Sequence, residues 1–274
     1  MNALDLQTAE RALASWRESF PRPLVDLSSL QRFDPYGLLL LVLEGRRCLE
    51  AAGRVRVLLP ENAQVRAALA KADPFAFLEG AVWLNGELPS PREGTLMITA
   101  RAEEEAGVHS LVDELTGRLH RRFPLARSSV RILSMAMLEL FQNIPQHANP
   151  RGARLDPFGL GALQELADHI HLVVADKGVG LLGSLAQGGR GCNLDHASAL
   201  EAALVDGMSR LAHPGRGGAL RRIRELVLRE GGEFYVRSGR GAFLQRGVEW
   251  SVGAVLPFPG VQVSVRLPRA LFEG

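Results

Sequence analysis

Three polar residues recur at four-residue spacing within the stretch MLELFQNIPQHANP, namely Glu139, Asn143 and His147. On a helix, residues four apart lie on one face, so the three side chains would point the same way. A carboxylate can polarise water, an amide oxygen can ligate a hard cation, and an imidazole can approach a phosphate. The pattern suits a site for a magnesium-bound nucleotide. A solvated polar stripe opposite the apolar residues of the same helix is the alternative.

A second group lies in HLVVADKGVGLL, where an apolar strand ends at Asp176 and is followed by Gly178 and Gly180. Glycines at such a turn let the backbone approach a ligand closely. An acid at the tip of a buried strand can accept a hydrogen bond from the exocyclic amine of adenine. An ordinary strand-to-loop turn also uses Asp and Gly, so this group alone does not decide between the two. The spacing matches neither the dinucleotide fingerprint nor the phosphate loop that ends in GK and Ser or Thr.

The third group is HPGRGGALRRIRELV, in which Gly215, Gly217 and Gly218 precede a helical pattern. A glycine loop that enters a helix N-terminus can bind an anion, because backbone N–H groups and the helix dipole point at it. A flexible loop before a capped helix is the alternative. The order of the three groups along the chain favours one shared site.

The elements that must position these groups are helices and strands of the C-terminal half. We expect helices at residues 107–123, 128–144 and 219–230, and strands at 170–175, 233–237, 253–256 and 261–267. Ser128 and Ser129 are candidate N-caps of the second helix. Pro145 should end or kink that helix near Phe141 and Gln142. The pattern predicts an α+β arrangement with helices over a mixed or antiparallel sheet.

Alternating strands and helices are predicted for the N-terminal half: strands at 24–27 and 54–59, and helices at 36–52 and 62–72. Gly53 is expected to end the first of these helices. The stretch NGELPSPREG is the best linker, and a strand at 95–100 should open the next unit. We therefore predict an α/β domain at residues 1–94 and a second domain at 95–274.

Composition limits the classes of protein to be considered. Hydrophobic residues make up 46% of the 274 residues and charged residues 23%, which is typical of a folded globular protein. A net charge of +2 gives no reason to expect a nucleic-acid surface. The longest apolar run, residues 38–43, is far shorter than the roughly 20 residues of a membrane helix. Cys48 and Cys192 lack metal-ligand spacing, so we expect free thiols and a cytoplasmic protein without a membrane partner.

The combined order of motifs at residues 95–268 resembles the GHKL superfamily of ATPases, which includes gyrase and sensor histidine kinases, and most of all the anti-sigma-factor serine kinases. The resemblance implies Mg²⁺ ligation by Asn143, a base or water-orienting role for Glu139, and adenine recognition by Asp176. It implies a mobile lid over ATP at residues 183–214. The residues that it places at ATP are Asn143, His147, Asp176, Gly178, Gly180, Gly215, Gly217 and Gly218.

Residues 20–85 resemble the STAS domain of anti-sigma-factor antagonists and sulphate transporters, in which a strand, an Asp-x-x-Gly turn, a helix and a second strand follow one another. Phosphorylated members carry a serine between that Asp and Gly. Here the turn, residues 34–37, is Asp-Pro-Tyr-Gly and has no Ser or Thr. Ser28 and Ser29 lie upstream and are interpreted as turn residues at the strand end.

Three hypotheses follow for function. The first is an ATP-binding regulatory protein in which Mg-ATP switches the interaction with a partner protein. The second is a protein serine kinase that acts on a separate STAS-type partner, with Glu139 positioning the acceptor hydroxyl. The third is a nonenzymatic scaffold with a degenerate pocket. Whether the chain is an enzyme stays open. ATP, Mg²⁺ and a regulatory protein are the expected partners, and a homodimer is one assembly open to the chain.

Overall fold

The chain is a mixed α/β protein made of two compact units. The computed structural model describes residues 1–78, 80–89, 98–102, 105–145, 159–191, 193–210 and 218–273. One unit comprises Met1–Thr99 and Ala162–Gln164, and the other comprises Ala100–Gly161 and Glu165–Gly274. The predicted boundary at residues 94 and 95 lies outside the described residues. Among the helices that are described, none has the length and apolar character needed to cross a membrane.

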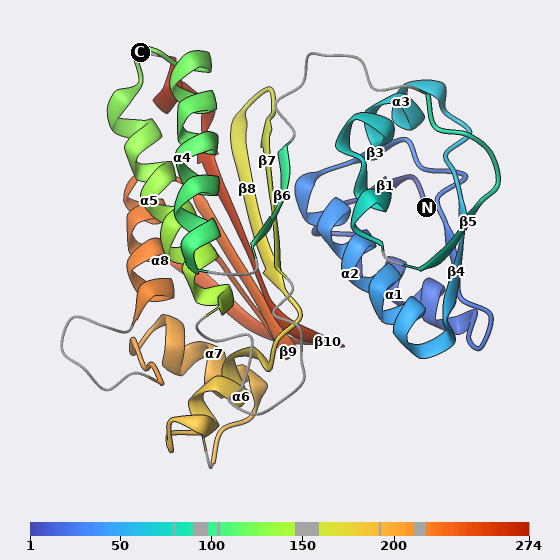
Figure 1. Cartoon of the computed structure of the whole chain (residues 1–274). Helices are drawn as coiled ribbons and strands as arrows, with labels where there is room; N and C mark the ends of the chain where they lie inside the picture. Colours follow the sequence, from blue (N-terminus) through green and yellow to red (C-terminus); the bar gives the residue numbers. More distant parts are fainter. Residues whose placement is uncertain are drawn as a thin grey trace. The chain divides into compact units, whose positions relative to one another are not determined.

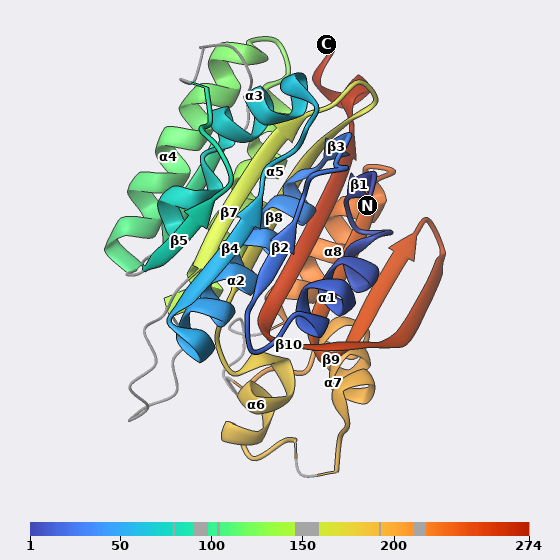
Figure 2. The same ribbon diagram turned by 90° about the vertical axis from the view of Figure 1, so that its right-hand side faces the viewer.

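Three short parallel strands run through the first unit in the order β2–β4–β5 (Figure 2). The strands are β2 (Leu24–Asp26), β4 (Arg54–Leu58) and β5 (Ala81–Leu84). Parallel neighbours need a crossover connection, and α2 and α3 supply the two crossovers, as the alternating pattern predicts. The remaining elements are α1 (Ala9–Glu18), α2 (Pro35–Ala52), α3 (Ala63–Ala72), a 3₁₀ helix (Pro74–Phe77), and the parallel pair β1 (Ala3–Leu4) and β3 (Arg32–Phe33).

Helix α2 begins one residue before the predicted start at residue 36 and ends at the predicted residue 52. The Asp34 side chain caps it by accepting a hydrogen bond of 2.9 Å from the Gly37 N–H. Gly37 lies against the backbone of β1, since a Cβ there would come 2.1 Å from the Leu4 carbonyl oxygen. Gly53 ends the helix in the left-handed conformation at φ 69°.

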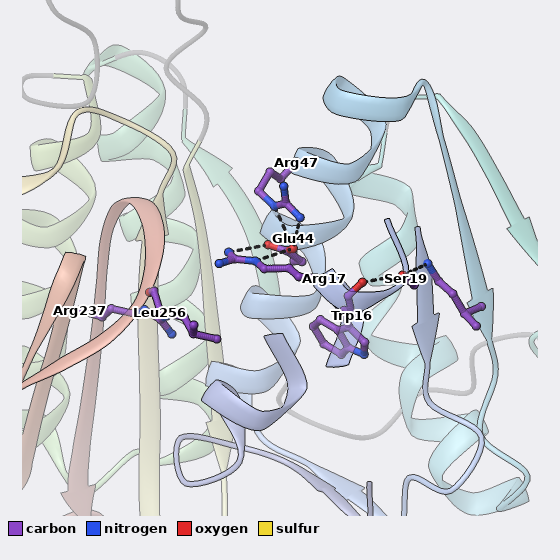
Figure 3. A network of polar contacts seen from close by, with 8 residues as sticks. Trp16, Arg17, Ser19, Glu44, Arg47, Arg237 and Leu256 are labelled. Atoms are coloured by element: carbon purple, nitrogen blue, oxygen red, sulfur yellow. Dashed lines mark hydrogen bonds and ion pairs between the residues drawn. The ribbon is translucent and has the colours of Figure 1, made fainter. Parts of the chain in front are cut away.

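A buried glutamate ties α1 to α2 (Figure 3). The fully buried Glu44 accepts hydrogen bonds from Arg17 Nε at 3.1 Å and from Arg47 Nη2 at 2.6 Å. Burial first, and then the Glu44 carboxylate, raises the pKa of Cys48 to about 11. Cys48 is a free, buried thiol, as predicted, whereas Cys192 lies outside the described residues.

The larger sheet, most of which belongs to the second unit, has five strands and carries helices along one face (Figure 1). Strand order is β6–β7–β8–β10–β9, and β10 is antiparallel to both of its neighbours. The strands are β6 (Ile98–Ala102), β7 (Gly159–Glu165), β8 (His169–Asp176), β9 (Glu233–Arg246) and β10 (Glu249–Pro268). The long helices are α4 (Glu105–Arg122), α5 (Arg127–Asn143) and α8 (Ala219–Arg229). Buried Leu220, Ile223 and Val227 form the apolar face of α8.

Strands β9 and β10 form one hairpin that is longer than the three separate strands expected at 233–237, 253–256 and 261–267. Its register shifts on either side of Phe258, next to Pro257 and Pro259. Proline cannot donate to a strand ladder, so this is where the pairing is interrupted. Arg237 bridges the interruption, because its Nη2 donates to the Leu256 carbonyl at 2.6 Å (Figure 3).

The predicted caps of α5 are wrong. The helix begins at Arg127 after Ala126, and the Ser129 hydroxyl donates instead to the Leu271 carbonyl at 2.6 Å. At the other end the helix continues through Asn143, two residues before Pro145. This extra length keeps residues 139 and 143 on one helix, a full turn apart.

Candidate functional site

A cavity of about 690 Å³ in the second unit is lined by α5, α8, β8, β10 and two helices that follow β8, α6 (Gly180–Gln187) and α7 (His196–Leu204). Its volume lies within the range of small-molecule sites. Five predicted site residues line it: Glu139, Asn143, Asp176, Gly180 and Gly218. The predicted residues His147, Gly215 and Gly217 lie outside the described residues.

Asp176 occupies the carboxyl end of β8 and is held there by two backbone amides. Its Oδ1 accepts from the Gly178 N–H at 2.7 Å, and its Oδ2 accepts from the Val261 N–H at 3.2 Å. Burial raises the pKa of Asp176 to about 6, against the opposing effect of these two hydrogen bonds. The side chain is therefore mostly ionised at neutral pH and can accept a further hydrogen bond from a ligand.

Two glycines allow the backbone around Asp176 to pack this closely. Gly260 has φ 74°, and a Cβ there would lie 2.0 Å from the Asp176 carbonyl oxygen. Gly180 has φ 72°, and a Cβ there would lie 2.8 Å from Ser238 Oγ. The same hydroxyl accepts a hydrogen bond from the Leu181 N–H at 2.8 Å. Of these, Gly260 and Ser238 carried no recognisable signal in the sequence, because they become neighbours of Asp176 only through the pairing of β8, β10 and β9.

The C-terminal turn of α5 places an acid and an amide at the cavity. Leu140 and Phe141 are buried, whereas Glu139 and Asn143 are partly exposed and line the cavity. Phe141 fits closely against β7, because a Cβ on Gly161 would come 2.1 Å from its ring. The apolar residues of α5 thus anchor the helix. Its polar residues Glu139 and Asn143 line the cavity.

Glu139 has an ionic partner that the sequence analysis did not single out. Arg222 Nη2 lies 3.2 Å from Glu139 Oε2, and the two residues come from α8 and α5. Both side chains line the cavity and are partly exposed. The charged cluster RRIRE in the sequence marks α8 as basic, but it does not show which arginine meets the acid.

Gly218 forms the N-terminal boundary of α8 at φ 66°, in the left-handed conformation. Ala219 and Leu220 continue the cavity lining from this point. The first backbone N–H groups of a helix lack partners within the helix, so the start of α8 is suited to an anion.

Several residues that line the cavity were not predicted from the sequence as site residues. The polar ones are His109, Gln142, Ser184, Ser209, Arg210 and Arg222, and the apolar ones are Leu140, Ile144, Val174, Leu181, Leu185, Ala203, Met208, Val261 and Val263. His109 of α4 lies within 3.3 Å of Gln142, joining their side chains at the cavity. The apolar set, which comes mainly from the sheet and α6, can pack against the faces of a planar ring.

The stretch predicted to be a lid, residues 183–214, contains regular structure in its described part. It holds most of α6 and all of α7, whose N-cap Asp195 accepts from the Ser198 N–H at 2.7 Å. His196 of α7 sits against β9, since a Cβ on Gly239 would come 2.2 Å from its Nδ1. The described part of residues 183–214 thus contains two short helices. Residues 211–217 lie outside the described range.

Asn143 and Glu139 offer two oxygen donors one helical turn apart. Mg²⁺ prefers oxygen ligands and usually takes only one or two from the protein, with water and phosphate oxygens completing its shell. No group of three or more His, Cys, Asp or Glu side chains that could hold a metal occurs in the part of the chain that the structure describes. One or two protein oxygens are the number that Mg²⁺ takes when a phosphate-bearing ligand and water supply the rest.

Comparison of the chain with models of known protein families gives no match, and comparison with curated protein sequences gives none either. A function is therefore inferred from the residues of this chain and their geometry.

Proposed function

We propose that the second unit binds ATP with Mg²⁺ in this cavity, and that binding switches the interaction of the chain with a partner protein. One observation carries the proposal. Three segments far apart in the sequence, each expected to meet a different part of ATP, line one cavity through Glu139, Asn143, Asp176 and Gly218. The sheet with helices on one face is also compatible with the GHKL resemblance.

Asp176 is the proposed acceptor for the exocyclic amine of adenine. Each carboxylate oxygen has two acceptor positions, and the amides of Gly178 and Val261 use one on each oxygen. With respect to the residues that the structure describes, each oxygen keeps one acceptor position for the ligand. Apolar neighbours such as Leu181 and Val263 can cover the ring faces, so the base would be bound by one specific polar contact within apolar walls.

The phosphate end is assigned to the start of α8. Gly218 opens the helix N-terminus, and Arg210 and Arg222 supply positive charge at the cavity. Asn143 would ligate Mg²⁺ through its amide oxygen, and the metal would neutralise charge on the phosphates. Both ends of the nucleotide then have partners of matching chemistry.

The first unit supports a regulatory role rather than phosphorylation of its own turn. The STAS-like Asp-x-x-Gly segment begins α2, and its only hydroxyl-bearing residue, Tyr36, is 1% exposed. A buried hydroxyl at this position is inaccessible to a kinase. We therefore place the responding surface on another protein. The cytoplasmic location and the homodimer stay predictions.

A serine kinase acting on a separate partner is the second candidate function. It is favoured by the Glu139 carboxylate, which lines the cavity and can orient or deprotonate an acceptor hydroxyl. Transfer of label from γ-labelled ATP to candidate STAS-type proteins tests it. Hydrolysis without transfer to any of them would contradict the kinase hypothesis.

Calorimetric titration with ATP, with and without Mg²⁺, tests the proposed function. We expect Asp176→Asn to abolish most of the binding and Asn143→Ala to remove its dependence on Mg²⁺. Asp168→Asn is the matched control, because Asp168 precedes β8 at its opposite end and is not among the cavity residues. A folded wild-type protein that does not bind ATP would reject the proposal and favour the scaffold hypothesis.

A further inference from the structure

The cavity contains an ion pair between a carboxylate, which can orient water or a hydroxyl, and a guanidinium, which can bind phosphate. Glu139 of α5 and Arg222 of α8 are 83 residues apart in sequence, yet Arg222 Nη2 and Glu139 Oε2 lie 3.2 Å apart. Both line the cavity. A carboxylate that is paired with a guanidinium is less available as an acceptor for a water molecule or a hydroxyl. The pair with Arg222 therefore reduces the availability of Glu139.

The ion pair between Glu139 and Arg222 is exposed to solvent and weak enough for a ligand to break. The exposed fractions of the two side chains are 51% for Arg222 and 41% for Glu139. Solvent screens such a pair, and its two flexible side chains lose entropy in forming it, so its net contribution is small. An incoming group that binds the guanidinium better therefore displaces the carboxylate at low cost.

A phosphate group is such a competitor. Arg222 lies in the first turn of α8, four residues after Gly218, where the helix N-terminus already favours an anion. A guanidinium can bind two phosphate oxygens at once, and Arg210 lines the same cavity. Phosphate and carboxylate are both negative, so they repel each other at this position and only one occupies Arg222.

We infer that Arg222 is a positioning residue that couples ligand binding to the state of Glu139: the phosphates of a nucleotide take Arg222 and thereby release the Glu139 carboxylate into the cavity. The inference rests on the proposed nucleotide site and deepens it. Glu139 is then more available to orient water or a hydroxyl when the phosphate site is filled than when it is empty.

The same helix carries a matched control. Arg221 Nε pairs with Glu225 Oε1 at 2.7 Å, and the exposed fractions of these side chains are 45% and 50%. Neither residue is among those that line the cavity. Variants of this pair change the charge of α8 as variants of Arg222 do, without touching the cavity.

The test is a set of titrations with ADP and with adenosine as probes, in Mg-free buffer so that a metal ion does not compete with Arg222 for the phosphates. We expect Glu139→Gln to bind ADP about threefold more tightly, because the competitor for Arg222 is gone. Arg222→Gln should bind ADP about tenfold more weakly. Both variants should bind adenosine like the wild type, and Arg221→Gln and Glu225→Gln should leave both affinities unchanged.

The double variant decides whether the two residues are coupled. In the Arg222→Gln background, Glu139→Gln should no longer tighten ADP binding. An equal gain in both backgrounds would show a general charge effect and overturn the inference, as would a loss of adenosine affinity in Arg222→Gln. If the wild type binds ADP and Glu139→Gln has the same ADP affinity, the inference is overturned but the proposed nucleotide site is not. Failure of the wild type to bind either probe, both in this buffer and with Mg²⁺ added, rejects the proposed function together with it.

Discussion

Two glutamates paired with arginine, one in each unit, show how differently the same chemical pair can be used. Glu44 is fully buried, and Arg17 and Arg47 occupy its oxygens at distances down to 2.6 Å. Glu139 is 41% exposed, has Arg222 at 3.2 Å, and faces a cavity of about 690 Å³. A buried carboxylate without its partners would be costly, so the Glu44 cluster is structural. The Glu139 pair is weak and accessible, which suits a site.

The largest expected effect tests the structural side of this comparison. Glu44→Gln should lower the free energy of unfolding of the first unit by about 3 kcal/mol, because it removes the charge that compensates two partly buried guanidiniums. Urea unfolding followed by circular dichroism measures it. The control Glu114→Gln breaks the exposed pair with Arg118 and should cost less than about 0.5 kcal/mol. Equal effects of the two variants would contradict the assignment of Glu44.

The next effect tests the backbone that supports the site in the second unit. Gly260→Ala should cost about 3 kcal/mol, because the added Cβ meets the Asp176 carbonyl and φ is 74°. Gly247→Ala has a similar φ of 57° but nothing within 4 Å of its Cβ, so it should cost about 1 kcal/mol. Thermal and urea unfolding of both variants compare the two costs. A similar loss at both positions would show that φ alone, and not the close packing around Asp176, limits residue 260.

A pH profile examines Asp176, the cavity acid that is held by the backbone amides of Gly178 and Val261. With its pKa raised to about 6, the carboxylate is ionised at pH 7.5 and mostly protonated at pH 5. Protonation removes the acceptor for the adenine amine, so adenosine affinity should fall about tenfold from pH 7.5 to pH 5. Calorimetry at both pH values measures this. Asp168→Asn should keep the profile, and a flat wild-type profile would argue against recognition through Asp176.

The smallest expected effect completes the comparison of the two pairs. Glu139→Gln and Arg222→Gln should each change the free energy of unfolding by less than about 1 kcal/mol, because solvent screens the pair. The same urea experiment as for Glu44 measures them. A loss as large as that of Glu44→Gln would make the Glu139 pair structural and remove the basis for a ligand-sensitive role.

Local sequence patterns predicted much of the fold where the pattern is strong. The helix that became α2 and its terminal Gly53 were predicted, because a left-handed glycine acts within one turn, whereas the capping role of Asp34 was not. The missed elements have weak local signals. Strand β7 includes Gly159 and Gly161, which pack against α5 and look like loop residues in the sequence. Pairing between β9 and β10 likewise extends both strands through glycines and prolines.

In the candidate site, too, some features follow from local sequence and others only from the tertiary structure. Residue type and spacing along the chain were sufficient to select Glu139, Asn143 and Asp176, since helix periodicity and a strand end are local properties. Only the tertiary structure decided that they face one cavity, that Gly260 holds the backbone near Asp176, and that Arg222 rather than Arg221 meets Glu139. Neighbouring arginines on a helix point about 100° apart, so the packing angle of α8 on α5 makes that choice, and no sequence pattern encodes it.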